Sequence, residues 1–348
     1  MSLRHRKLGR PLVVVALVHV LLGTLSTFAD AQSIEDFYRG RSVRLTVAAA
    51  PGGGADLYAR VLARHLAKHI PGQPSFIIQN APGAAGLLVA RQLQNSAPGD
   101  GSVVALLQRN NLLEPLLSDR DLGFDPRKVT WIGSLNKDTY LIFSWHTSGV
   151  RTIEDAMQKE LILGNTGGAN ENVTFPLLLN QTLGTRFRLV RGYKGSSDLA
   201  IAIERGEIQG RAMTWTTLRG DHPDWLNERK VNVIVQLALK RNADLPEVPS
   251  AVEYIKDEKD QRLYQLLFAT LEAGRPFAVA KGTPPDRVAA LRKAFAEVAQ
   301  DDEFLKELKQ RGGSIEYMTG EDVEQLISSI YATPRDVIDR ARALVSER

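Results

Sequence analysis

The chain contains no cysteine among its 348 residues. This absence excludes disulfide bonds, thiolate metal sites and a lipid anchor on an N-terminal cysteine. The fold must therefore be held together by its hydrophobic cores. Hydrophobic residues make up 43% and charged residues 24% of the chain, which is a globular composition, and the length suits two domains.

The chain also lacks a real excess of positive charge. Its formal net charge is +4, from 44 Lys and Arg against 40 Asp and Glu. Four of these bases (Arg4, Arg6, Lys7 and Arg10) and a single acid, Asp30, lie in the first 31 residues. Without that segment 40 bases and 39 acids remain, a net charge of +1. This balance gives no support for nucleic-acid binding.

An uncharged run, residues 11–29, lies in this same N-terminal segment. A basic stretch precedes the apolar core at residues 12–22, and Ala29-Asp30-Ala31 follows as an A-x-A cleavage pattern. This order predicts a secretory signal peptide over residues 1–31, cleaved after Ala31, and a periplasmic protein that begins at Gln32. The alternative is a transmembrane anchor, because the uncharged run is nearly long enough to span a bilayer.

After this leader, strand-like and helix-like segments alternate. Apolar β-rich runs predict strands at residues 43–49, 75–80, 102–108, 161–165, 186–193, 208–215, 231–239 and 275–282. Amphipathic helical patterns lie between them, as in residues 56–70 and 87–97, and two more helices close the chain. The alternation predicts an α/β fold with parallel-rich sheets flanked by helices. We expect domain 1 to comprise residues 32–139 and 272–348, and domain 2 residues 140–271.

Three glycine-bearing turns each follow a predicted strand and open a helix. They are Pro51–Asp56, Ala81–Gly86 and Thr166–Asn172. Ligands of open α/β sheets bind at the carboxyl ends of strands, and a helix start offers free N–H groups to an anion. We expect Asp56 to cap the helix after its turn or to orient a bridging water, and Thr283 to cap a C-terminal helix.

Motifs for catalysis or metal binding are incomplete. PGGGAD (51–56) lacks the Lys-Ser/Thr of a phosphate-binding P-loop, and there is no G-x-S-x-G elbow. Ser134 and Lys137 match S-x-x-K without its companion motifs. His65 and His69 are spaced for one helix face but lack the glutamate of H-E-x-x-H, so a packed or solvated pair is favoured over a metal site. We expect no catalytic residue, metal or cofactor.

Several segments resemble the solute receptors of tripartite tricarboxylate transporters, also called the Bug or TctC family. The matching stretches, in order, are FYRGRSVRLTVAAAPGGGADLYARVLARHL, IIQNAPGAAGLLVARQLQNSAPGDGSVVAL, RLVRGYKGSSDLAIAIERGEIQGR, LPEVPSAVE and AKGTPPDRVAALRKAFAEVAQDDEFLKEL. They cover nearly the whole chain after the leader.

The resemblance implies a two-domain periplasmic-binding-protein fold of type II-like topology that closes like a flytrap. It implies capture of a small organic acid and delivery to a large and a small integral-membrane transporter subunit. We expect a monomer without nucleic-acid partners. With the polar candidates found in the sequence, the expected ligand-binding residues are Gly53, Gly54, Ala55, Asp56, Tyr58, Ala84, Ala85, Gly86, Arg109, Asn110, Thr166, Gly168, Asn170, Asn172, Tyr193, Gly195, Ser196 and Trp215.

The chain departs from the family pattern at two places. Many members have a serine-rich turn with a histidine where this chain reads GGANEN (167–172), and Glu171 there would repel an anion. Arg109 follows a strand where small residues are usual. Its guanidinium suits a bidentate carboxylate contact, or equally a surface or interdomain salt bridge. Trp215 suits either a ligand cover or a core filler.

Two other functions stay open at this level. A receptor of this kind can pass its closed state to a signalling partner instead of a transporter. A hydrolase or nucleotide-using enzyme on a similar scaffold would need a nucleophile–base pair or a complete phosphate motif, and the sequence shows neither.

Overall fold

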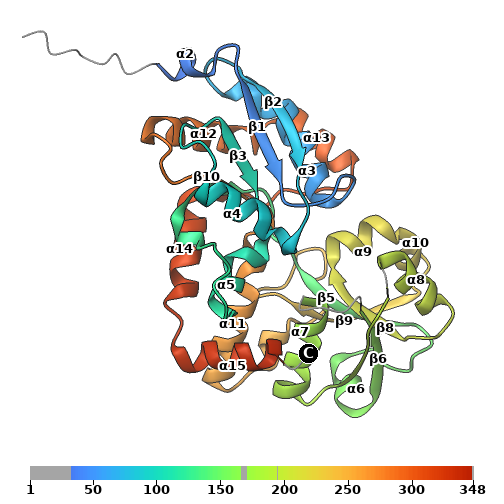
Figure 1. Cartoon of the computed structure of the whole chain (residues 1–348). Helices are drawn as coiled ribbons and strands as arrows, with labels where there is room; N and C mark the ends of the chain where they lie inside the picture. The colour runs from blue at the N-terminus through green and yellow to red at the C-terminus, as the bar shows by residue number, and fades with distance from the viewer. Residues whose placement is uncertain (1–32, 166–170, 194, 347–348) are drawn as a thin grey trace, which may run out of the picture.

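The computed structural model describes residues 33–165, 171–193 and 195–346. Figure 1 shows two α/β regions joined side by side, one drawn mainly in blue and one in green and yellow. The leader, including the predicted cleavage site, lies outside the described residues.

The described strands form two sheets. The first has the order β11-β4-β10-β3-β1-β2. Its strands are β1 (Ser42–Val47), β2 (Ser75–Asn80), β3 (Val103–Leu106), β4 (Val129–Ser134), β10 (Pro276–Ala280) and β11 (Met318–Thr319). The second has the order β7-β6-β8-β5-β9. Its strands are β5 (Tyr140–Trp145), β6 (Glu160–Gly164), β7 (Arg186–Val190), β8 (Gly210–Thr214) and β9 (Val231–Leu237).

Both sheets are mixed. The strand–helix–strand units give the parallel pairs, β1 with β2 and β3, and β6 with β7 and β8. The antiparallel pairs come from strands that enter a sheet from the other domain's side: β10 pairs with β3 and β4, and β5 pairs with β8 and β9. β3, β5 and β10 are buried throughout, which explains their continuous apolar sequences.

Helices cover the faces of both sheets (Figure 1). They are α2 (Ile34–Tyr38), α3 (Gly54–Leu66), α4 (Leu87–Asn95), α5 (Glu114–Leu117), α6 (Ile153–Gln158), α7 (Glu171–Leu183), α8 (Ser196–Glu204), α9 (Trp215–Asp221), α10 (Pro223–Asn227), α11 (Glu258–Glu272), α12 (Pro285–Val298), α13 (Asp302–Gln310), α14 (Gly320–Tyr331) and α15 (Arg335–Ser346). Short 3₁₀ segments are η1 (Ala67–His69), η2 (Ala84–Gly86), η3 (Arg109–Leu112), η4 (Pro126–Lys128) and η5 (Ala251–Tyr254). None of the helices in the described part of the chain has the length and apolar character to cross a membrane.

The predicted cap of α12 is wrong. Thr283 donates its hydroxyl to the carbonyl of Ala280 at 2.8 Å, and Pro284 is the N-cap, without a side-chain capping bond. The helix begins one residue later, at Pro285. A proline at the helix start supplies the right φ angle whichever residue precedes it, so the Thr-Pro-Pro sequence does not fix the boundary.

Two chain segments cross between the sheets and run beside each other. Gly274 N–H donates to the Asn136 carbonyl at 2.8 Å, and Asp138 N–H donates to the Leu271 carbonyl at 2.9 Å. A Cβ on Gly274 would lie 2.8 Å from Asn136 Oδ1, so only glycine allows this close approach. Helix α15 packs against α5, α7 and α11. The two regions therefore meet at the paired crossing and along these helices.

Candidate functional site

The first glycine turn is shaped by the buried carboxylate of Asp56. Its Oδ2 accepts hydrogen bonds from Gly52 N–H and from Arg60 Nε, both at 2.9 Å, and its Oδ1 accepts one from Asn80 Nδ2 at 2.9 Å. The hydrogen bond from Arg60 and those from Gly52 and Asn80 hold the pKa of Asp56 below its ordinary value. The residue is not the helix cap that the sequence predicted, because Gly53 is the N-cap of α3. Asp56 instead fixes the turn from within.

Arg275 lies over the first turn of α3. Its Nη2 would be 3.2 Å from a Cβ placed on Gly54, so the glycine makes room for the guanidinium. Arg275 precedes β10 directly and its side chain is 20% exposed. A guanidinium beside a helix N-terminus gives a strongly positive position that suits a carboxylate. The sequence patterns did not single out Arg275. It does, however, open a predicted apolar strand close to the point where the chain is expected to return to domain 1, and a charged residue at such a place could have been noticed.

The second glycine turn has an unusual backbone. Ala84, Ala85 and Gly86 follow one another with φ angles of +46°, +52° and +89°. Left-handed alanines are strained by about 1–3 kcal/mol each, and such strain concentrates at functional sites. The carbonyl of Ala85 is held by the side-chain amides of Asn110, at 3.3 Å, and Asn111, at 3.1 Å.

A cavity of about 820 Å³ opens between this turn and the helices below it. Ala85, Gly86 and Asn110, three of the predicted ligand-binding residues, lie in its wall with Glu171 and Phe175. The remaining wall is formed by Ala48, Pro82, Gly83, Gln108, Leu113, Glu114, Leu117, Ser118, Asp119, Arg120, Leu122, Thr174, Leu267, Thr270 and Val345. The wall thus combines residues before position 123 with residues of α7, α11 and α15.

A chain of charged side chains crosses from the first turn to α7. Arg275 Nη1 lies 3.5 Å from the carboxylate of Asp138, and Arg109 pairs with the same carboxylate. Arg109 Nε also donates to Glu171 at 2.9 Å. Burial lowers the pKa of Arg109, but the carboxylates of Glu171 and Asp138 outweigh it and raise the pKa above its ordinary value. Of the two roles considered for Arg109, the structure shows the salt bridge between the two regions.

Other predicted site residues lie away from the cavity. Tyr58 is buried in the core, where its hydroxyl donates to the Ser314 carbonyl at 2.7 Å and accepts from Ser314 N–H at 3.0 Å. The hydroxyl is therefore satisfied within the core, while the Tyr58 ring lies beside Arg275, whose Cζ is 5.4 Å from the ring centroid. Gly53, Gly54, Ala55 and Ala84 belong to the two turns but not to the cavity wall.

The second-domain candidates fall into two groups. Thr166, Gly168 and Asn170 lie outside the described residues, whereas Asn172 is the second residue of α7. Tyr193 is half-buried against the core of the second sheet, Gly195 is the N-cap of α8, and Ser196 is its first residue.

Trp215 does not end a strand, as the sequence predicted. It is the first residue of α9. Its Nε1 donates to Asp244 at 3.0 Å and its ring packs against the core of the second sheet. This placement matches the core-filler role better than a ligand cover.

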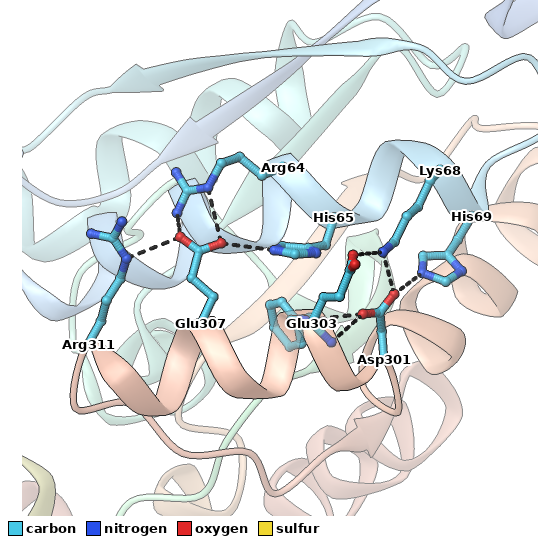
Figure 2. Close-up of polar contacts among 9 residues, drawn as sticks. Arg64, His65, Lys68, His69, Asp301, Glu303, Glu307 and Arg311 are labelled. Carbon is cyan, nitrogen blue, oxygen red and sulfur yellow. Dashed lines mark hydrogen bonds and ion pairs between the residues drawn. The ribbon is translucent and has the colours of Figure 1, made fainter.

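His65 and His69 belong to an ion-pair network between α3 and α13 (Figure 2). His65 Nε2 is 2.9 Å from Glu307, and His69 Nε2 is 3.1 Å from Asp301. The ammonium of Lys68 lies between Asp301 and Glu303, at 2.7 and 3.0 Å. Although His65, Asp301 and Glu303 have ligand atoms within 4.8 Å of one another, both carboxylates already form ion pairs with Lys68. The network is thus a packed contact between helices, as the sequence favoured.

Solved structures of known proteins share this architecture. A TctC solute-binding protein from Polaromonas, solved without ligand, superposes with a TM-score of 0.68 at 22% identity, covering 89% of this chain and 100% of that one. An R. palustris protein solved with adipate gives a TM-score of 0.63 at 20% identity, covering 87% and 97%. MatC from Rhodopseudomonas palustris, solved with malate, gives 0.61 at 20% identity, covering 88% and 99%. The fold is therefore that of periplasmic binding proteins, as predicted.

The sequence comparisons give the family. The model of the tripartite tricarboxylate transporter family receptor matches residues 58–343. A UPF0065 protein from the gbd 5′ region of Cupriavidus necator is 25% identical over 338 residues, which is 94% of each chain. The chain belongs to the tripartite tricarboxylate transporter family of receptors, and the resemblance seen in the sequence is confirmed.

Proposed function

We propose that this protein is a periplasmic receptor that binds a small organic acid in the cleft between its two sheets and delivers it to the membrane subunits of a tripartite transporter. The observation that carries the proposal is the first-domain half of the cleft. Arg275 lies over the start of α3, where a glycine makes room for it, and the strained second turn forms the adjoining cavity wall. Family membership and the acids bound by the solved relatives support the same class of ligand.

In this proposal the receptor binds its ligand without changing it chemically. A carboxylate at the first turn would receive charge-assisted hydrogen bonds from Arg275 and from the N–H groups that open α3. One helix terminus contributes about 0.3–1 kcal/mol, while micromolar affinity needs about 8 kcal/mol. Several donors in a closing cleft are therefore needed. Contacts from both domains in the closed state would shift the open–closed equilibrium on binding.

A thermal-shift screen tests the proposal. The protein lacking residues 1–31 is mixed with mono-, di- and tricarboxylic acids and with sugars and cations at matched ionic strength. An acid at 100 times its dissociation constant should stabilise the fold by about 2.7 kcal/mol. Arg275→Met should abolish the shift, whereas Arg39→Met, which removes the exposed arginine that follows α2, should keep it. A clear shift with sugars or cations and none with acids overturns the proposal.

A further inference from the structure

The second sheet contains a buried arginine that neither the family comparison nor the cleft described above accounts for. Arg211, in β8, is 6% exposed. Its guanidinium makes one long hydrogen bond among the described residues, from Nη2 to the hydroxyl of Ser196 at 3.5 Å. Its Nε and Nη1 are buried and have no hydrogen-bond partner, and no carboxylate in the described part of the chain forms an ion pair with it. Arg109 and Arg275, by contrast, both contact Asp138.

Such a group is costly to the fold. Burial lowers the pKa of Arg211, with Tyr140 and Asp221 acting in the opposite direction. A guanidinium nevertheless keeps its proton at neutral pH, so the side chain carries an unpaired positive charge. Buried charges in proteins are normally paired, and one that is not is a candidate for a functional role. The four charges of the Arg275–Asp138–Arg109–Glu171 chain balance one another, so none of them is left over to pair with Arg211.

The position of Arg211 is that of a ligand-binding residue. In the parallel pairing of β6 with β8, Leu163 is opposite Gly210, so Arg211 is level with Gly164, the last residue of β6. The contact with Ser196 places the guanidinium at the start of α8, whose N-cap, Gly195, makes no side-chain capping bond. Arg211 is only the second residue of β8, but it is level with the carboxyl ends of β6 and β7, where Gly164 pairs with Val190. A cation and a helix N-terminus therefore coincide at the carboxyl ends of this parallel pair, where anions bind in open α/β sheets.

Arg211 is also linked to the charged chain across the cleft. Tyr140 in β5 interacts electrostatically with Arg109, Glu171 and Arg211. The other charged group near Arg211 is Asp221 at the end of α9, which acts on it without forming an ion pair. Tyr140 is opposite Thr214 in the pairing of β5 with β8, whereas Arg211 is opposite Phe143, so this link is electrostatic and not a direct contact.

We propose that Arg211, with Gly195 and Ser196 at the start of α8, binds an anionic group of the ligand from the second-domain side, and that this contact selects acids with two carboxylates. This inference rests on the proposed receptor function and assigns one residue to its specificity. One carboxylate would bind at the first-domain turn beside Arg275. The second would neutralise Arg211, which pairs with no acid in the described chain.

The first experiment needs no knowledge of the ligand. Arg211→Met keeps most of the side-chain volume and removes the charge. Because an unpaired buried charge is removed, this variant should melt at the same temperature as the parent protein or higher when no ligand is added. A large drop in melting temperature, or failure to fold, would show that Arg211 stabilises the fold itself and would overturn the proposal.

The second experiment measures selectivity. Succinate, glutarate and adipate are titrated calorimetrically beside butyrate, valerate and hexanoate, which have the same chain lengths and one carboxylate fewer. Arg211→Met should weaken the best dicarboxylate by about ten- to hundredfold and leave the monocarboxylates unchanged. Arg211→Lys should retain part of the preference, and Arg39→Met all of it. Unchanged dicarboxylate affinity in Arg211→Met overturns the proposal.

The two proposals fail in distinguishable ways. If the parent protein binds no acid, the receptor function proposed above fails. In that case, sulfate, compared with chloride at equal ionic strength, still tests the anion site. Sulfate should raise the melting temperature of the parent protein more than that of Arg211→Met, and equal responses would remove Arg211 as an anion-binding residue.

Discussion

At the residue scale, the buried carboxylate of Asp56 decides the shape of the first turn. It receives three hydrogen bonds, from Gly52, Arg60 and Asn80. Removing the carboxylate takes away the acceptor of the Gly52 N–H and one of the two acceptors of the Asn80 amide, which also donates to the Ala49 carbonyl. The turn would then lose the geometry that brings the start of α3 to Arg275.

We therefore predict that Asp56→Ala lowers the free energy of unfolding by about 1–3 kcal/mol and weakens acid binding. Urea denaturation and calorimetric titration measure the two effects. The matched control is Glu228→Ala, which removes an exposed carboxylate paired with Lys230 and should leave both quantities unchanged. A stable Asp56→Ala protein with normal affinity would contradict this description of the turn.

The pair of Arg109 and Glu171 supports a second prediction. Arg109→Met leaves the buried carboxylate of Asp138 with two longer contacts, to Arg275 and to the Asn136 amide, so we expect a loss of about 3 kcal/mol in unfolding free energy. Glu171→Gln keeps an oxygen that accepts from Arg109 and removes a negative charge from the cavity wall. It should cost little stability and tighten acid binding by an amount on the order of 1 kcal/mol. Weaker acid binding in Glu171→Gln would show that this carboxylate contributes to ligand recognition.

At the scale of elements, helices α3 and α13 are joined by the network in Figure 2. Arg64, His65 and Arg311 all contact Glu307. The hydrogen bonds from Arg64 and His65 lower the pKa of Glu307 from an ordinary value of 4.5 to about 2. The pKa of Asp301 is likewise held below its ordinary value, by Lys68, the Phe304 N–H and His69 against the effect of burial.

These shifts predict acid sensitivity of the contact between α3 and α13. Because both carboxyl pKa values are depressed in the folded protein, their contribution to stability is complete above about pH 4.5 and is lost as the pH falls toward 2. Urea denaturation between pH 2.5 and 7 should show unfolding free energy declining across the lower half of that range. Glu307→Gln should be less stable than the parent protein at pH 6, and the difference should shrink at pH 3. A constant difference across the range would contradict the assignment.

Whether a strand could be predicted from the sequence depends on how far along the chain its pairing partners lie. The units β1-α3-β2-α4-β3 and β6-α7-β7-α8-β8 were predicted because each strand and its crossover helix are neighbours in the sequence. β4 and β5 were not, although every residue of β5 is buried. Their pairing partners β10 and β9 lie far along the chain, so no local strand–helix pattern marks them. The sequence therefore predicted the fold class and the parallel halves of both sheets, and not their antiparallel pairs.

The same reasoning applies to the site. The glycine turns could be predicted because turn chemistry is local. The charged chain from Arg275 through Asp138 to Glu171 could not, because it assembles residues from the crossing, β10 and α7. Arg211 had a local signal, a single charge inside the apolar run IQGRAMTW, but only the structure shows that the charge is buried and unpaired.

At the scale of the whole molecule, the sequence predicts that the protein is exported. The N-terminal segment carries the basic, apolar and A-x-A parts of a signal peptide. The mature protein should therefore begin at Gln32 and be recovered in the periplasmic fraction. Intact-mass measurement of the protein expressed from its full sequence checks this directly. A product that retains residues 1–31 in the membrane fraction would favour the anchor instead.

The central claim is that the cleft between the two sheets recognises a carboxylate. The most direct test is calorimetric titration of the protein lacking residues 1–31 with the best acid from the thermal-shift screen and with the neutral amide of the same acid. The account predicts saturable binding of one acid per chain, no measurable binding of the amide, and loss of binding in Arg275→Met. Equal affinity for the acid and its amide would contradict it.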